Sequence, residues 1–195
     1  MANKLQFIET DKPFFVFSIE ADRDYLLARL INFSGAGFAP RAGYFGQQAL
    51  EKYMKAFLVQ SVKNYPKTHD LFSIAKECSK VDEEFSKPDF IKDIKIFDDF
   101  REVGRYGGAS SYDPNSKKTQ SFQTAGTYAW IDMNIKILDR RVYEIRGKLD
   151  YQKIKFSDSL IAILKGERTD FLEVEWKLPL KLDEILSAGN DFFKK

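Results

Sequence analysis

The residue best suited to acid–base chemistry is His69, the only histidine among the 195 residues of the chain. An imidazole changes its charge near neutral pH, so it can act as a general acid or base. His69 stands in the run Thr68-His69-Asp70-Leu71, before a predicted helix that Thr68 or Asp70 can cap. Two interpretations stay open: His69 fixes this turn by bonding backbone or packing against Tyr65 and Leu71, or it contacts a ligand.

A second group of side chains could bind phosphate. Arginine has a planar fork of donors that can hold two phosphate oxygens at once, and tyrosine can stack on a base. The candidate nucleotide- or phosphate-binding side chains are Gln48, Lys52, Lys55, Arg101, Arg105 and Tyr106. The alternative for the first three is a solvated helix face. Arg101 continues an apolar stripe, so it could instead extend past the edge of the core.

The composition excludes several classes of protein. The net charge is only +2, from 31 basic and 29 acidic residues, so any site that attracts anions must be local. One histidine cannot form a zinc helix with two histidines, and one cysteine, Cys78, cannot form an internal disulfide. Residues 35–40 lack the third glycine and the lysine of a phosphate-binding loop. We expect neither a metal nor a cofactor.

The apolar residues predict a folded core and no membrane segment. Hydrophobic residues make up 44% of the chain and 18 of them are phenylalanines, which predicts an aromatic-rich core. No stretch approaches the roughly 18 to 20 apolar residues of a membrane span, and the amino terminus lacks a basic segment leading into an apolar run. We therefore expect a cytoplasmic protein without membrane contact.

The spacing of apolar residues predicts the helices that must position these side chains. Four helices are expected in succession: 19–33, 41–61, 70–80 and one that opens at Pro88. The second carries the Gln48–Lys55 side chains, and the third follows the breaker Asn64-Tyr65-Pro66 and the His69 turn. Arg101 falls near the end of the fourth, before a long glycine-containing loop that is more often functional than a mere connector.

A fifth helix has the most regular pattern. Its apolar residues alternate steps of three and four without a miss, which predicts a helix from about residue 125 to 149, roughly 36 Å long. The stripe consists of Tyr128, Ile131, Ile135, Leu138, Val142, Ile145 and Leu149. It could form the core of a bundle, a dimer seam, or both.

The last part of the chain has a different period. Leu172, Val174, Trp176 and Leu178 alternate with charged residues, as in a half-buried strand. Residues 159–165 could pair with this strand in a β-hairpin or form a turn or two of helix, and a short helix is expected beyond it. The sequence thus predicts an all-α, antiparallel up-and-down bundle of four to five helices in residues 1–152, with a small C-terminal appendage, 153–195, packed on the same domain.

Three motifs in a fixed order resemble the HEPN domain family of small helical nucleotide-binding domains. They are Gln47-Gln48-Ala49-Leu50-Glu51-Lys52, then Thr68-His69-Asp70-Leu71, then Arg105-Tyr106, followed by a final long helix. The resemblance covers about residues 18–150. It implies an antiparallel bundle, a homodimer and a polar cleft near the loop after the fourth helix. Many relatives are ribonucleases, often toxins paired with a nucleotidyltransferase.

The chain departs from the ribonuclease motif of that family, an arginine followed four to six residues later by histidine. Arg101 matches the arginine, but Tyr106, Gly107 and Gly108 stand where the histidine is expected. Lys63 and His69 mimic the spacing at a different place. We therefore expect a non-catalytic nucleotide- or RNA-binding module. The alternatives are a metal-independent ribonuclease toxin of a toxin–antitoxin pair, acting through Arg101 or His69, and a structural dimerisation partner of a nucleotidyltransferase.

Overall fold

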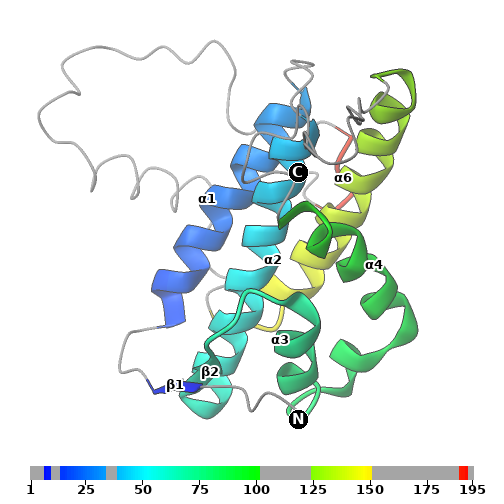
Figure 1. The fold of residues 1–195 in the computed structure, drawn as a ribbon. Coiled ribbons are helices and arrows are strands. Elements are labelled where there is room, and N and C mark those ends of the chain that lie inside the picture. Colours follow the sequence, from blue (N-terminus) through cyan, green and yellow to red (C-terminus); the bar gives the residue numbers. More distant parts are fainter. Residues whose placement is uncertain (1–6, 10–13, 34–38, 102–123, 151–188, 193–195) are drawn as a thin grey trace, which may run out of the picture.

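The computed structural model describes residues 7–9, 14–33, 39–101, 124–150 and 189–192. Within these ranges the chain is an antiparallel helical bundle, as the sequence predicts (Figure 1). The elements, in chain order, are β1 (Phe7–Glu9), α1 (Phe14–Phe33), α2 (Ala39–Val62), β2 (Asn64–Pro66), α3 (Leu71–Cys78), η1 (Glu83–Ser86), α4 (Pro88–Asp98) and α6 (Thr124–Arg146). The proposed C-terminal hairpin, Arg105 and Tyr106 lie outside the described residues.

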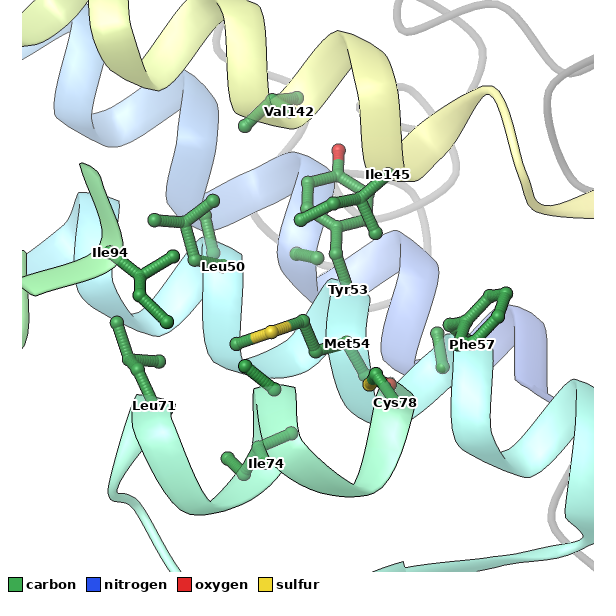
Figure 2. Close-up of a cluster of buried hydrophobic side chains, with 14 of the residues drawn as sticks. Leu50, Tyr53, Met54, Phe57, Leu71, Ile74, Cys78, Ile94, Val142 and Ile145 are labelled. Atoms are coloured by element: carbon green, nitrogen blue, oxygen red, sulfur yellow. The ribbon is translucent and has the colours of Figure 1, made fainter. Parts of the chain in front are cut away.

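Helix α2 is the centre of the bundle. It packs against α1 along most of its length and also contacts α3, α4 and α6. Figure 2 shows Met54 of α2 directed toward Leu71 and Ile74 of α3, with Tyr53 on another side of α2 near Ile145 of α6. All five side chains are at most 1% exposed. The Gln48–Lys55 segment therefore lies on the element that neighbouring helices hold most firmly.

The core is rich in aromatic side chains, as the composition predicts. Phe57, Phe85 and Phe90 form a continuous cluster of tilted and edge-to-face contacts, with ring centroids 4.9 Å and 5.2 Å apart. Cys78 is buried beside Met54, and its thiol contacts the Met54 carbonyl oxygen at 3.6 Å. Burial raises the pKa of this thiol far above its ordinary value, so Cys78 is a core residue and no nucleophile.

Two glycines set the distance between α2 and α4. A Cβ atom on Gly43 would overlap the ring of Phe100, and one on Gly46 would lie 3.0 Å from the ring of Phe97. The absence of these side chains lets α4 rest against the first half of α2. This packing also brings the end of α4, with Arg101, to the bundle.

The regular stripe of α6 faces the core of its own bundle. Leu138, Val142, Ile145 and Leu149 are at most 1% exposed, and Ile135 packs partly buried against them. For these positions the core interpretation is confirmed, and they offer no exposed dimer seam. The side chains of Tyr128 and Ile131 lie outside the described part.

A buried polar cluster joins α1, α6 and the segment 189–192. The Asp139 carboxylate accepts hydrogen bonds from the Tyr25 hydroxyl at 2.5 Å and from the Arg29 guanidinium, and Asn190 donates to the Tyr25 oxygen at 2.9 Å. Arg29 and Asn190 are completely buried. Burial, reinforced by the Asp139 charge, raises the pKa of the Tyr25 phenol well above its ordinary value, so Tyr25 stays a donor.

A two-stranded sheet lies at the end of α2, where the sequence indicated only a breaker. β1 and β2 pair antiparallel, with Phe7 opposite Pro66 and Glu9 opposite Asn64. Between α2 and β2, Lys63 has a φ of 60°, the left-handed conformation that ends many helices. The His69 turn follows directly, so the sheet fixes its starting point. None of the described helices has the length and apolar character of a membrane span.

Candidate functional site

The site is built around Glu51, a carboxylate of α2 that is almost completely buried. Its side chain is 4% exposed and receives three donors. Lys55 Nζ lies 2.8 Å from Oε1, Gln47 Nε2 lies 3.3 Å from Oε2, and His69 Nδ1 lies 2.9 Å and 3.1 Å from the two oxygens. A buried carboxylate is tolerated only when it is paired and hydrogen-bonded in this way. Glu51 thus joins one face of α2 to the turn before α3.

The His69 turn is fixed by its backbone, while the His69 ring stays accessible. Gln47 Nε2 donates to the His69 carbonyl oxygen at 3.1 Å, and the Thr68 hydroxyl accepts the Asp70 N–H at 3.1 Å. Asp70 caps α3, as predicted, by accepting the Ser73 N–H at 3.0 Å. Side chains of Gln47, Thr68 and Asp70 therefore hold the backbone of this turn.

The His69 side chain has a different partner from the one expected. Its ring binds Glu51, whereas the sequence suggested packing against Tyr65 and Leu71. The side chain is 66% exposed. Because a carboxylate only accepts hydrogen bonds, Nδ1 is the donor, and the neutral ring therefore carries its lone pair on Nε2. A carboxylate that holds an imidazole in this tautomer is the usual means of orienting a histidine for proton transfer or ligand contact.

The two lysines of the predicted pocket point to different partners. Lys52 binds Asp24 of α1 at 2.7 Å and lies 3.5 Å from Glu20. Burial alone would lower the pKa of Lys52, but these two carboxylates raise it above its ordinary value. Lys55 instead binds Glu51 and lies 5.5 Å from the centre of the Tyr65 ring. Both charges are thus largely neutralised within the bundle.

The Glu51–Lys55 pair is not the ordinary helix-surface pair that its spacing suggests. The Lys55 side chain is only 9% exposed. β2 and the following turn cover this face of α2, with Tyr65 over the lysine. Gln48, also on this helix, donates from Nε2 to Gln47 Oε1 at 2.6 Å. Gln48, Lys55 and the His69 turn therefore belong to one connected cluster, and Lys52 faces α1 instead.

Arg101 follows the end of α4, which meets the start of α3. Asp98, one turn earlier in α4, accepts the Leu71 N–H at 3.2 Å, so the end of α4 meets the start of α3. Burial and the charge of Asp70 raise the pKa of Asp98, while the Leu71 hydrogen bond and the positive charge of Arg101 oppose that shift. The charge of Arg101 therefore acts on Asp98, the residue that holds the start of α3. Arg105 and Tyr106 fall outside the described residues.

Two features of the site escaped the sequence-based prediction. Lys67 is exposed, stands two residues before His69, and has no ion-pair partner in the described part of the chain. Glu51 and Gln47 emerge as the residues that hold the turn. The spacing of Gln47, Glu51 and Lys55, four residues apart on one helix face, was a usable signal. Within the described ranges, no group of histidine, cysteine or acidic side chains is arranged to hold a metal ion.

The described helices define a small antiparallel-bundle domain in which a polar cluster ties the second helix to the start of the third. The HEPN domain family model matches residues 20–126, more than half of the chain. The chain therefore belongs to the HEPN domain family. No curated protein and no solved structure matches it.

Proposed function

We propose that this HEPN-domain protein binds the phosphates of a nucleotide or of single-stranded RNA at the turn formed by residues 67–70. The supporting observation is the exposed His69 ring held on the buried Glu51 carboxylate. When the ring is protonated, its Nε2–H can donate a hydrogen bond to a phosphate oxygen, and the anchored ring loses little entropy when it does so.

Two exposed lysines add positive charge to the surface around His69. Lys63 and Lys67 flank β2, and both are exposed without an ion-pair partner among the described residues. Their charges are available to phosphate, unlike those of Lys52 and Lys55, which acidic side chains already neutralise. The anion site is thus local, as a nearly neutral chain requires.

The test is the binding of a fluorescent single-stranded RNA, followed by anisotropy over a range of salt concentrations. Lys67→Ala should weaken binding and reduce the slope of log affinity against log salt by about 0.7, the value for one lost phosphate contact in a single strand. His69→Ala should also weaken binding. Lys92→Ala removes an exposed lysine of α4 and is the matched control. Equal effects of Lys67→Ala and Lys92→Ala, or no binding at millimolar ligand, would refute the proposal.

A second candidate function is metal-independent cleavage of RNA, which the Glu51–His69 pair favours. His69 Nε2 would take the proton of a ribose 2′-hydroxyl, and the 2′ oxygen would bond to phosphorus. The bond to the 5′ oxygen would break and that oxygen would take a proton from water, leaving a 2′,3′-cyclic phosphate and a 5′-hydroxyl end.

Cleavage assays with purified protein separate the two candidates. The ribonuclease candidate predicts that His69→Ala abolishes cleavage, that Arg101→Ala slows it, and that a 2′-deoxy substitution in the substrate blocks it. Equal cleavage by the parent protein and both variants would identify a contaminating nuclease. RNA binding without cleavage would leave the binding module as the function.

A further inference from the structure

Residues 189–192 dock against α1 and α6, beside α6 in Figure 1, where they are red. Asn190 is completely buried, and its Nδ2 donates to the Tyr25 hydroxyl oxygen of α1 at 2.9 Å. The Phe192 ring contacts the Tyr143 ring of α6, with ring centroids 5.2 Å apart. The segment thus places an amide side chain on one helix and, two residues later, an aromatic side chain on another.

Helices α1 and α6 form the receiving side of this contact between themselves. The Asp139 carboxylate of α6 accepts hydrogen bonds from the Tyr25 hydroxyl at 2.5 Å and from the Arg29 guanidinium. Because the Tyr25 proton is directed at Asp139, the Tyr25 oxygen presents a lone pair to the segment. Tyr25, Asp139 and Tyr143 therefore define a slot between the two helices, and the buried end of this slot accepts a hydrogen bond from its occupant.

The segment presents Asn190 to the slot through its own local structure. Gly189 has a φ of 62°, a left-handed conformation that glycine adopts without strain. The Phe192 N–H donates to Asn190 Oδ1 at 3.1 Å, so the carboxamide oxygen is engaged within the segment and Nδ2 is directed to Tyr25. Side-chain-to-backbone bonds of this kind form in short peptides. The residue that enters the slot is therefore oriented by its immediate neighbours.

The slot distinguishes asparagine from aspartate, although the two side chains have nearly the same shape. Aspartate has no donor for the Tyr25 oxygen. Its charge would also lie near the Asp139 carboxylate, and like charges held together are costly. Arg29, which could offset a second negative charge, already forms an ion pair with Asp139. The ligand that fits is a peptide with an asparagine and, two residues later, an aromatic side chain.

The aromatic end of the contact remains open to water. Tyr143 is 50% exposed and Phe192 is 38% exposed. Because this ring contact buries only part of each side chain, it gains little from the hydrophobic effect. Segments with few buried apolar contacts open locally, at a small fraction of the free energy of global unfolding. The occupied slot is therefore a reversible contact.

We propose that the slot between α1 and α6 is a recognition site for a peptide segment of this asparagine–aromatic type, and that residues 189–192 occupy it as a releasable latch. A competing peptide of the same chemistry enters the slot when the latch opens. The slot shares no residue with the His69 turn, so this proposal goes beyond RNA binding and does not depend on it.

The test uses the full chain and a fluorescent synthetic peptide of residues 187–195, with binding followed by anisotropy. Asn190→Asp in the full chain should free the slot and bind the peptide at least about tenfold more tightly than the parent chain, whose tethered segment competes at high effective concentration. A peptide that carries Asn190→Asp should bind at least about tenfold more weakly than the natural peptide, because it lacks the hydrogen bond to a buried oxygen. Asn64→Asp, the same change in β2 of the full chain, is the matched control and should leave the parent affinity unchanged.

Latch opening is measured independently in the parent protein by amide hydrogen exchange, while circular dichroism checks the fold of the Asn190→Asp chain. The Phe192 amide should exchange through local opening, at a rate that low urea concentrations leave unchanged, whereas the Ile145 amide in the core should follow global unfolding. A Phe192 amide that exchanges by global unfolding would show that the segment is no latch. Equal binding of the two peptides, equal binding by the parent and Asn190→Asp chains, or no binding to the Asn190→Asp chain at millimolar peptide would overturn the recognition site.

Discussion

Replacing Glu51 by alanine should destabilise the protein more than any surface substitution, because it leaves a buried ammonium group without a counter-charge. Lys55 is 9% exposed, and its Nζ binds only Glu51 among the carboxylates of the described residues. Breaking a buried pair by removing one partner typically costs about 3 to 5 kcal/mol. The lysine can recover part of that loss by extending toward water at the exposed turn, so we expect about 3 kcal/mol for Glu51→Ala.

Lys55→Met should be less costly, because Glu51 keeps two other donors, Gln47 and His69. We expect about 1 to 2 kcal/mol for it. In the double variant neither charge is left unpaired, so its loss should be smaller than the sum of the single losses by about 2 kcal/mol. The pair Glu77–Lys80, whose lysine is 62% exposed, provides the comparison cycle, and its coupling should be below about 1 kcal/mol.

The assay is urea unfolding followed by circular dichroism, with the slope of the transition checked for each variant. Losses that add to within about 0.5 kcal/mol at Glu51 and Lys55 would mean that the two side chains do not act as a buried pair. A coupling as small as that of Glu77 and Lys80 would lead to the same conclusion. In either case the anchoring of His69 by a buried carboxylate would lose its basis.

Further predictions concern packing, pH and assembly. Gly43→Ala should cost about 1 to 3 kcal/mol in thermal or urea unfolding because its methyl group meets the Phe100 ring, whereas the exposed Ser61→Ala on the same helix should be neutral. The pKa of Asp98 is raised in the folded state, so the unfolded chain loses this proton at a lower pH than the folded chain does. The free energy of unfolding should therefore fall as pH rises from 3.8 to the folded-state pKa. Asp98→Asn should make this fall shallower, and an unchanged pH profile would contradict the assignment. The homodimer stays a prediction, and sedimentation velocity should give twice the monomer mass of 22.6 kDa.

The sequence predicted the helices well because their signals are local. The three–four spacing of α6 and the proline at the start of α4 act within one element, and both are confirmed. β1 and β2 span three residues each, too few to show a strand period. Their pairing joins residues 55 to 59 positions apart, which no local pattern reveals.

The candidate site was harder to predict because its chemistry depends on burial. A glutamate four residues before a lysine has the same spacing whether the pair is exposed or covered, and only the turn around Tyr65 decides between the two. Lys52 was assigned to a phosphate pocket, yet it binds Asp24, 28 residues away in α1. A role of His69 in ligand contact stays a prediction, and the spacing of Glu51 and Lys55 did not reveal that Glu51 is buried against the His69 ring.

The buried cluster around Asp139 also bears on how the protein folds. Its hydrogen bonds join residues 110, 114 and 165 positions apart. Until Asp139 and Asn190 arrive, the guanidinium of Arg29 and the hydroxyl of Tyr25 cannot make these hydrogen bonds. During synthesis, α1 and α2 can pair but cannot complete this core, so they should remain open to chaperones until the late residues emerge. Folding should therefore be slower than the local contacts of a helical hairpin would suggest.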